Sequence, residues 1–176
     1  MSLLIIRTMN SMVLVPCLCL VALVGAQVPG FGPCPNIQPM QHFDVKKYLG
    51  VWYEQKRYFA IFEAGGICVT AQTSRYTSIK GEAKLTGKDG EGKLGVTFPS
   101  VGGFQAPYIV LGTDYWSYAV VTSCVDLYQI GNFQLAWILT RKAHPTEETL
   151  AKIDQVLSTS PLNVHYFRKT PQTCNY

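Results

Sequence analysis

The stretch Gly50-Val51-Trp52-Tyr53-Glu54-Gln55-Lys56-Arg57 decides how the rest of this chain is interpreted. It follows the segment 44–49, in which Asp44 is a suitable N-cap for a short helical turn. From Gly50 to Tyr58 the side chains alternate well enough to predict a strand. A glycine followed two residues later by a tryptophan would open that strand. The pattern is too short to define a fold alone, so its meaning depends on the strands that follow.

The chain beyond Tyr58 predicts a series of short strands and one late helix. Further strands are expected at 67–76, 79–86, 93–98, 106–112, 117–125 and 133–140, and a short final strand at 164–168. Between the last two of these, Pro145-Thr146-Glu147-Glu148 supplies a cap and an acidic first turn, and Leu150, Ile153 and Leu157 recur at the spacing of an amphipathic helix. Many short strands followed by one helix are typical of an all-β barrel or sandwich.

The first residues of the chain predict a signal peptide at 1–26. Arg7 precedes an apolar run from Met12 to Val24, and the small residues Gly25 and Ala26 end it. The run is too short to span a bilayer, which takes about 20 residues, and no later stretch predicts a membrane span. We therefore expect a secreted, extracellular protein with a single domain at 27–176. Without Arg7 the formal net charge falls from +4 to +3, and the scattered lysines do not indicate a nucleic-acid partner.

Four cysteines remain after this segment: Cys34, Cys68, Cys124 and Cys174. An even number in an oxidising compartment predicts two disulfides, with three pairings open. None of the spacings is that of a metal or redox motif, and the histidines lie far from the cysteines in sequence, so no metal site is expected. Gly87–Lys93 resembles a phosphate-binding loop, but Leu94 replaces the Ser or Thr that such a loop requires. With no other catalytic motif, the sequence predicts that the protein is not an enzyme.

Two further motifs give Gly50 and Trp52 a context. Thr113-Asp114-Tyr115 lies between two predicted strands, and Arg141 directly follows the strand that ends at Thr140. In this order, and followed by the helix, these motifs resemble the three signatures of the lipocalin family. The resemblance implies an up-and-down antiparallel β-barrel of eight strands with one C-terminal helix. An arginine stacked on an indole would close the narrow end by cation–π contact and backbone hydrogen bonds. The residues expected to close the barrel are Gly50, Trp52, Thr113, Asp114, Tyr115 and Arg141.

The closer resemblance is to the branch of apolipoprotein D, lazarillo and the bilin-binding proteins. It rests on 32–35, 43–54, 68–71, 106–108 and 136–141 and covers most of the chain after residue 26. It implies the disulfides Cys34–Cys124 and Cys68–Cys174. It also implies transport of a small hydrophobic ligand such as a bilin, a carotenoid, a retinoid, a fatty acid or a sterol. No cofactor is required, and a receptor or a second copy of the chain stays open as a further partner.

Strand alternation indicates which side chains face the cavity. If Arg141 points inward, then the residues at alternate positions before it share its side. The expected ligand contacts on that strand are Phe133, Leu135, Trp137 and Leu139, and those on neighbouring strands are Tyr108, Val110, Tyr118 and Val120. The same residues could instead pack a plain core. Thr73 stands where the relatives often carry a pocket tyrosine, so the ligand does not transfer directly.

The sequence departs from the family between Tyr76 and Gly81, where the relatives carry a further strand with its turns. We therefore predict seven barrel strands, a gapped wall with an exposed edge, and a leakier pocket. Two alternatives to ligand transport follow from other features. A lipid-isomerising enzyme of lipocalin type would need a reactive thiol, and a protein with a defective pocket would serve as an interaction partner instead.

Overall fold

A computed structural model of the chain describes residues 28–60, 69–72, 82–97, 103–128 and 130–174. The predicted signal peptide lies outside the described residues, as does Thr73. Within the described part, no helix is both long enough and apolar enough to cross a membrane.

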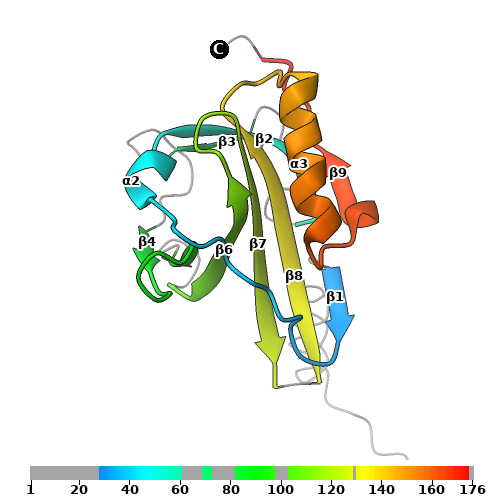
Figure 1. The fold of residues 1–176 in the computed structure, drawn as a ribbon. Coiled ribbons are helices and arrows are strands. Elements are labelled where there is room, and N and C mark those ends of the chain that lie inside the picture. Colours follow the sequence, from blue (N-terminus) through cyan, green and yellow to red (C-terminus); the bar gives the residue numbers. More distant parts are fainter. Residues whose placement is uncertain (1–27, 61–68, 73–81, 98–102, 129, 175–176) are drawn as a thin grey trace, which may run out of the picture.

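One antiparallel sheet forms most of the molecule (Figure 1). Its strands follow the order β3-β2-β8-β7-β6-β5-β4, β1 pairs with β8, and β9 pairs with β2. The bounds are β1 Val28–Phe31, β2 Val51–Tyr58, β3 Thr70–Gln72, β4 Glu82–Leu85, β5 Lys93–Thr97, β6 Gln105–Thr113, β7 Tyr118–Leu127, β8 Gly131–Thr140 and β9 Phe167–Lys169. The seven predicted barrel strands are therefore present, at least in part. Strand β1 precedes them and is a further strand of the sheet.

The directions of the strands explain how a barrel with one strand fewer is arranged. The first barrel strand, β2, pairs antiparallel with the last, β8, and every other neighbour is also antiparallel. Consequently β3 and β4, the two ends of the sheet, run in the same direction. The last residue of β3, Gln72, pairs with Val51, the first residue of β2. The first residue of β4, Glu82, pairs with Thr97, the last residue of β5, so it lies at the opposite ends of the strands. Among the described residues β3 and β4 do not pair with each other, which agrees with a gapped wall.

Two helices start at the caps that the sequence predicts. Asp44 accepts hydrogen bonds from the backbone N–H groups of the short helix α2, Val45–Tyr48. Thr146 accepts one from Thr149 in α3, Glu147–Thr159. Pro161 follows α3 closely and cannot continue it. A 3-10 turn at Val164–Tyr166 then leads into β9, so the predicted final strand begins later than expected.

The sheet has two apolar faces because α3 covers part of its outside (Figure 1). Along β8, Trp137 and Leu139 belong to the interior, whereas Ala136 and Ile138 pack toward α3. The interior cluster consists of Phe43, Tyr48, Trp52, Leu94, Val110, Ala119, Val121 and Leu139, with Met40, Val45, Tyr108, Tyr115 and Trp137 packed against it. Helix α3 contributes Ile153 and Leu157 to the outer cluster.

The disulfide Cys34–Cys124 is present and ties the arm before α2 to β7. Cys174 is also disulfide-bonded. Its expected partner, Cys68, lies outside the described residues, so the pairing Cys68–Cys174 stays a prediction.

Candidate ligand-binding site

Trp52 and Arg141 close one end of the sheet. The guanidinium carbon of Arg141 lies 3.6 Å from the centroid of the Trp52 ring. Trp52 is only 2% exposed, and its Nε1 donates to the carbonyl of Tyr48 at 2.9 Å. A cation over an indole that is shielded from water is attracted by about 2 kcal/mol. This contact therefore combines electrostatic attraction with the packing of a large aromatic ring.

Arg141 also binds the backbone around the turn that precedes Trp52. Its Nη2 donates to the carbonyl of Leu49 at 2.9 Å, its Nη1 to that of Val51 at 2.9 Å, and its Nε to that of Tyr115 at 3.0 Å. Gly50 lies between the first two partners with φ +111°, and a Cβ there would approach Arg141 Nη1 to 2.9 Å. Glycine is needed at this position for two reasons: it adopts the positive φ without strain, and it leaves room for the Arg141 side chain. Burial lowers the pKa of the Arg141 guanidinium from its ordinary value.

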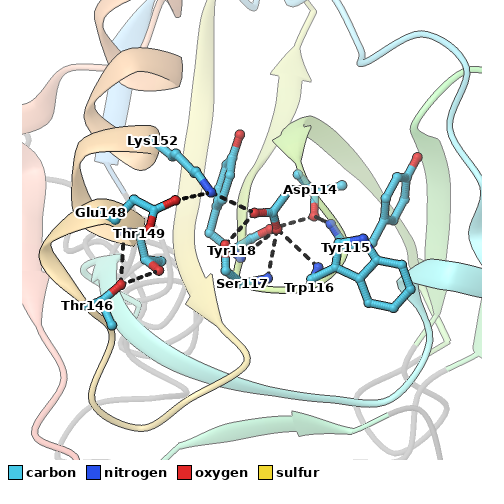
Figure 2. A network of polar contacts seen from close by, with 10 residues as sticks. Asp114, Tyr115, Trp116, Ser117, Tyr118, Thr146, Glu148, Thr149 and Lys152 are labelled. Carbon is cyan, nitrogen blue, oxygen red and sulfur yellow. Dashed lines mark hydrogen bonds and ion pairs between the residues drawn. The ribbon is translucent and has the colours of Figure 1, made fainter.

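Figure 2 shows how Asp114 holds the loop between β6 and β7. Its Oδ1 accepts from the backbone N–H groups of Trp116, Ser117 and Tyr118 at 3.1, 2.7 and 3.2 Å. On the α3 side, Lys152 Nζ lies 3.7 Å from Asp114 Oδ2. Asp114 therefore orders this loop and connects it to the helix on the outer face.

The adjacent Tyr115 connects the same loop to α2. Tyr115 has a positive φ of 69°, and its hydroxyl accepts from the backbone N–H of Asp44 at 3.0 Å. Its backbone N–H donates to Thr113 Oγ1 at 2.9 Å. The side chains of Thr113, Asp114 and Tyr115 thus stabilise the closed end by accepting hydrogen bonds from backbone N–H groups.

Asp114→Asn should lower the free energy of unfolding by about 1 kcal/mol at neutral pH, allowing for partial solvent screening. Desolvation alone would raise the pKa of Asp114, but hydrogen bonds from Ser117 and the following backbone outweigh it and lower the pKa below 3.8. A carboxyl whose pKa is lower in the folded state stabilises above its unfolded pKa and loses that contribution as the pH falls through the folded pKa. The difference between the two proteins should thus shrink below about pH 4. Urea melts from pH 7 to pH 2.5 would measure it; a difference that grows with acidification would contradict this account.

Among the described residues, Tyr48 and Tyr108 form a polar pair within the apolar lining of the interior. The hydroxyls of Tyr48 and Tyr108 lie 2.8 Å apart, and the Tyr108 ring stacks toward Trp137 with centroids 6.5 Å apart. Burial raises the pKa of Tyr108 to about 12 and that of Tyr48 well above its ordinary value. Both tyrosines are therefore neutral hydroxyls at physiological pH. One of the two hydroxyl protons forms the hydrogen bond between the tyrosines. The other hydroxyl proton can therefore be donated to a further acceptor inside the barrel.

The structure brings most of the expected ligand contacts to the inner face. Trp137, Leu139, Tyr108 and Val110 belong to the interior cluster or pack against it. Phe133 and Leu135 alternate with Ala136 in the same sense as Trp137, and both are partly buried.

The expected inward orientation of Tyr118 and Val120 is wrong, because both belong to the outer cluster with α3. On β7 it is Ala119 and Val121 that face the interior. Nearly every residue of this strand is apolar or buried, since α3 covers its other face, so alternation could not reveal which set points inward. Phe43, Tyr48 and Leu94 also belong to the interior cluster but were not among the expected contacts.

Two hollows formed by described residues lie outside the interior cluster. One, of about 270 Å³, lies between Leu111 and the last turn of α3, and the other, of about 180 Å³, lies beside Trp116. No group of three or more His, Cys, Asp or Glu side chains among the described residues could hold a metal ion.

A sheet coiled around an apolar interior and closed by an arginine–tryptophan stack defines a β-barrel of the ligand-binding class. Residues 49–173 match the family model of the lipocalin / cytosolic fatty-acid binding protein family. The chain belongs to this family.

Its relatives confirm the branch that the sequence motifs indicated. The chain is 32% identical to apolipoprotein D of Mus musculus, over 80% of this chain and 83% of that protein. It is 29% identical to the bilin-binding protein of Pieris brassicae, over 82% and 86%. Among solved structures it resembles insecticyanin from the tobacco hornworm Manduca sexta, with a TM-score of 0.70 at 21% identity over 82% of this chain and 88% of that one. The structural likeness supports the barrel fold.

Proposed function

We propose that this chain binds and carries a small hydrophobic molecule between the inner face of the sheet and the closed end. The apolar interior next to Trp137 supplies the contact surface, and family membership supports the assignment. Tyr48 and Tyr108 provide a polar anchor within that surface. Retinoids, fatty acids, sterols, bilins and carotenoids all combine an apolar body with few polar groups, and the relation to the bilin-binding protein favours a pigment among them.

The Tyr48–Tyr108 pair carries this proposal. Tyr48 is buried and Tyr108 is half-buried, and a hydroxyl removed from water is costly unless its hydrogen-bonding capacity is used. Neither tyrosine serves the closed end through its hydroxyl, because Arg141 and Trp52 bind the backbone carbonyl of Tyr48 instead. An acceptor atom at one end of an apolar ligand would take the remaining proton of the pair.

Fluorescence titration with retinol, oleic acid and biliverdin tests the proposal. At least one of them should quench the tryptophan fluorescence of the protein. A ligand bound at the Tyr48–Tyr108 pair would lie close to Trp137, whose ring stacks toward that of Tyr108. Trp137→Phe should remove most of that quenching. Trp116→Phe is the matched control, since Trp116 is 74% exposed and lies outside the interior cluster, and it should leave the quenching in place. No quenching by any of the three ligands would favour the alternative of an interaction protein with a defective pocket.

The chain is proposed to act without catalysis. The lipid-isomerising alternative needs a reactive thiol, whereas the described cysteines Cys34, Cys124 and Cys174 are disulfide-bonded. Labelling the native protein with a thiol reagent distinguishes the two functions. Stoichiometric labelling of Cys68 would support the enzyme.

We also propose that the protein is secreted. The apolar run after Arg7 supports this, as does the Cys34–Cys124 disulfide, because disulfides persist in oxidising compartments. N-terminal sequencing of protein from the culture medium should find a chain beginning at Gln27. Retention of residues 1–26 in the cell-associated protein would contradict it.

A further inference from the structure

Strand β4 forms one end of the sheet and is exposed along its whole length. All four of its residues are exposed, and within the described residues it pairs with β5 alone. A free strand edge is a template for pairing with another strand. Neither Glu82 nor Lys84 forms an ion pair with a described residue. The edge therefore offers both backbone groups and charges to a partner.

The ladder to β5 decides which backbone groups face outward. The N–H of Thr86 donates to the carbonyl of Lys93, so these two residues form a hydrogen-bonded pair at the end of the ladder. Hydrogen-bonded and non-hydrogen-bonded pairs alternate in an antiparallel ladder. Lys84 and Glu82 thus direct their N–H and C=O groups toward β5. The N–H and C=O groups of Ala83 and Leu85 point away from β5, to the edge that no described strand covers.

This pattern restricts how a second copy of β4 could pair around a two-fold axis. Two opposed residues must both direct their N–H and C=O groups toward the partner strand or both direct them toward their own β5. The two-fold axis must therefore pass between a residue and the same residue of the other copy. An axis at Lys84 would place the two Lys84 side chains opposite each other, and an axis at Glu82 would oppose two carboxylates. An axis at Leu85 would place Lys84 opposite the uncharged Thr86, whereas an axis at Ala83 places Glu82 of each copy opposite Lys84 of the other. Like charges directly opposite destabilise a sheet, whereas opposite charges stabilise it.

The side chains of β4 favour the same arrangement. Leu85 is opposite Leu94, which is buried in the interior cluster, so Leu85 and Ala83 lie on the inner face and Glu82 and Lys84 on the outer face. Leu85 nevertheless remains 56% exposed. A second copy paired at this edge would extend the inner face beside Leu85 and keep the charges outside.

We propose that two copies of this chain dimerise by antiparallel pairing of their β4 strands around Ala83. Each copy then donates Ala83 N–H to the Ala83 carbonyl of the other, and two Glu82–Lys84 pairs flank these bonds. The pairing is short, so the dimer is weak and forms only at high protein concentration.

Sedimentation velocity over about a hundredfold range of concentration tests the dimer, since its population follows mass action. The purified protein should show a monomer–dimer equilibrium. Glu82→Lys should weaken dimerisation about tenfold by opposing four cations, and Lys84→Glu should do the same with four anions. The double variant Glu82→Lys/Lys84→Glu restores complementary pairs and should restore dimerisation. Asp154→Lys, a charge reversal on the exposed face of α3, is the matched control and should dimerise like the original protein.

Cysteine substitution tests the register separately. Ala83→Cys should yield a disulfide-linked dimer on mild oxidation, because directly opposed residues have Cα atoms about 5.5 Å apart. Lys84→Cys should not, because Lys84 opposes Glu82. A monomer at every concentration, or a dimer that is insensitive to both charge reversals, would overturn the proposal. Failure of the double variant to dimerise, or preferential linkage through position 84, would overturn the register.

Discussion

Trp52→Ala should lower the free energy of unfolding by about 3–5 kcal/mol, the cost of removing a large aromatic side chain from a packed core. Trp52 is 2% exposed, its ring centroid lies 5.2 Å from that of Tyr48, and the Arg141 guanidinium lies over its ring. The variant also leaves Arg141 without its cation–π partner. Urea unfolding followed by far-UV circular dichroism would measure the change without depending on tryptophan fluorescence.

Trp116→Ala is the matched control for this substitution. Trp116 is 74% exposed and lies in the loop that Asp114 orders, so the same chemical change should alter stability by no more than about 0.5 kcal/mol. Equal losses for Trp52→Ala and Trp116→Ala would contradict the role of Trp52 in closing the barrel.

Glu54→Gln should cost about 3–5 kcal/mol, because it removes one member of a buried ion pair. The side chain of Glu54 is 3% exposed and its Oε1 forms a very short contact with Arg57 Nη1. The same oxygen accepts from Thr170 Oγ1, and Gln172 Nε2 donates to the Glu54 carbonyl at 2.7 Å. This network fastens the C-terminal segment to β2. Glutamine preserves the shape of the side chain but not its charge, so the loss should appear in the urea midpoint.

The control for Glu54→Gln is Glu148→Gln on α3. Glu148 also forms an ion pair, at 2.9 Å from Lys152, but its side chain is 79% exposed. Exposed pairs contribute little because water and salt screen them. The midpoint of Glu148→Gln should match that of the original protein, and a loss as large as that of Glu54→Gln would show that burial is not the cause.

The closed end could be predicted from sequence because its parts are short, local motifs. Gly50 and Trp52 open one strand, and Arg141 ends another, so a strand pattern places each of them. The alternation of β8 likewise predicts the shared side of Trp137 and Leu139. The shared side of Trp137 and Leu139 follows from periodicity along one strand, whereas the contact of Arg141 with Trp52 was expected from the resemblance to the lipocalin signatures.

The parts that the sequence did not reveal depend on contacts between distant segments. Tyr48 and Tyr108 are 60 positions apart, and no periodicity relates a helical turn to β6. On β7 both faces are buried, so alternation could not separate Tyr118 from Ala119. Strand β1 contains Pro29 opposite Phe133 and pairs with β8 alone among the described strands, and such an edge strand tolerates a proline.

Native mass spectrometry of the protein purified from its source would show whether the folded chain carries a ligand. If the chain carries a small hydrophobic molecule, the folded protein should show a discrete added mass that is lost on denaturation. The released molecule should be apolar, with a polar group able to accept the proton of the Tyr48–Tyr108 pair. A homogeneous protein with no added mass, which also takes up none of retinol, oleic acid and biliverdin, would contradict the claim.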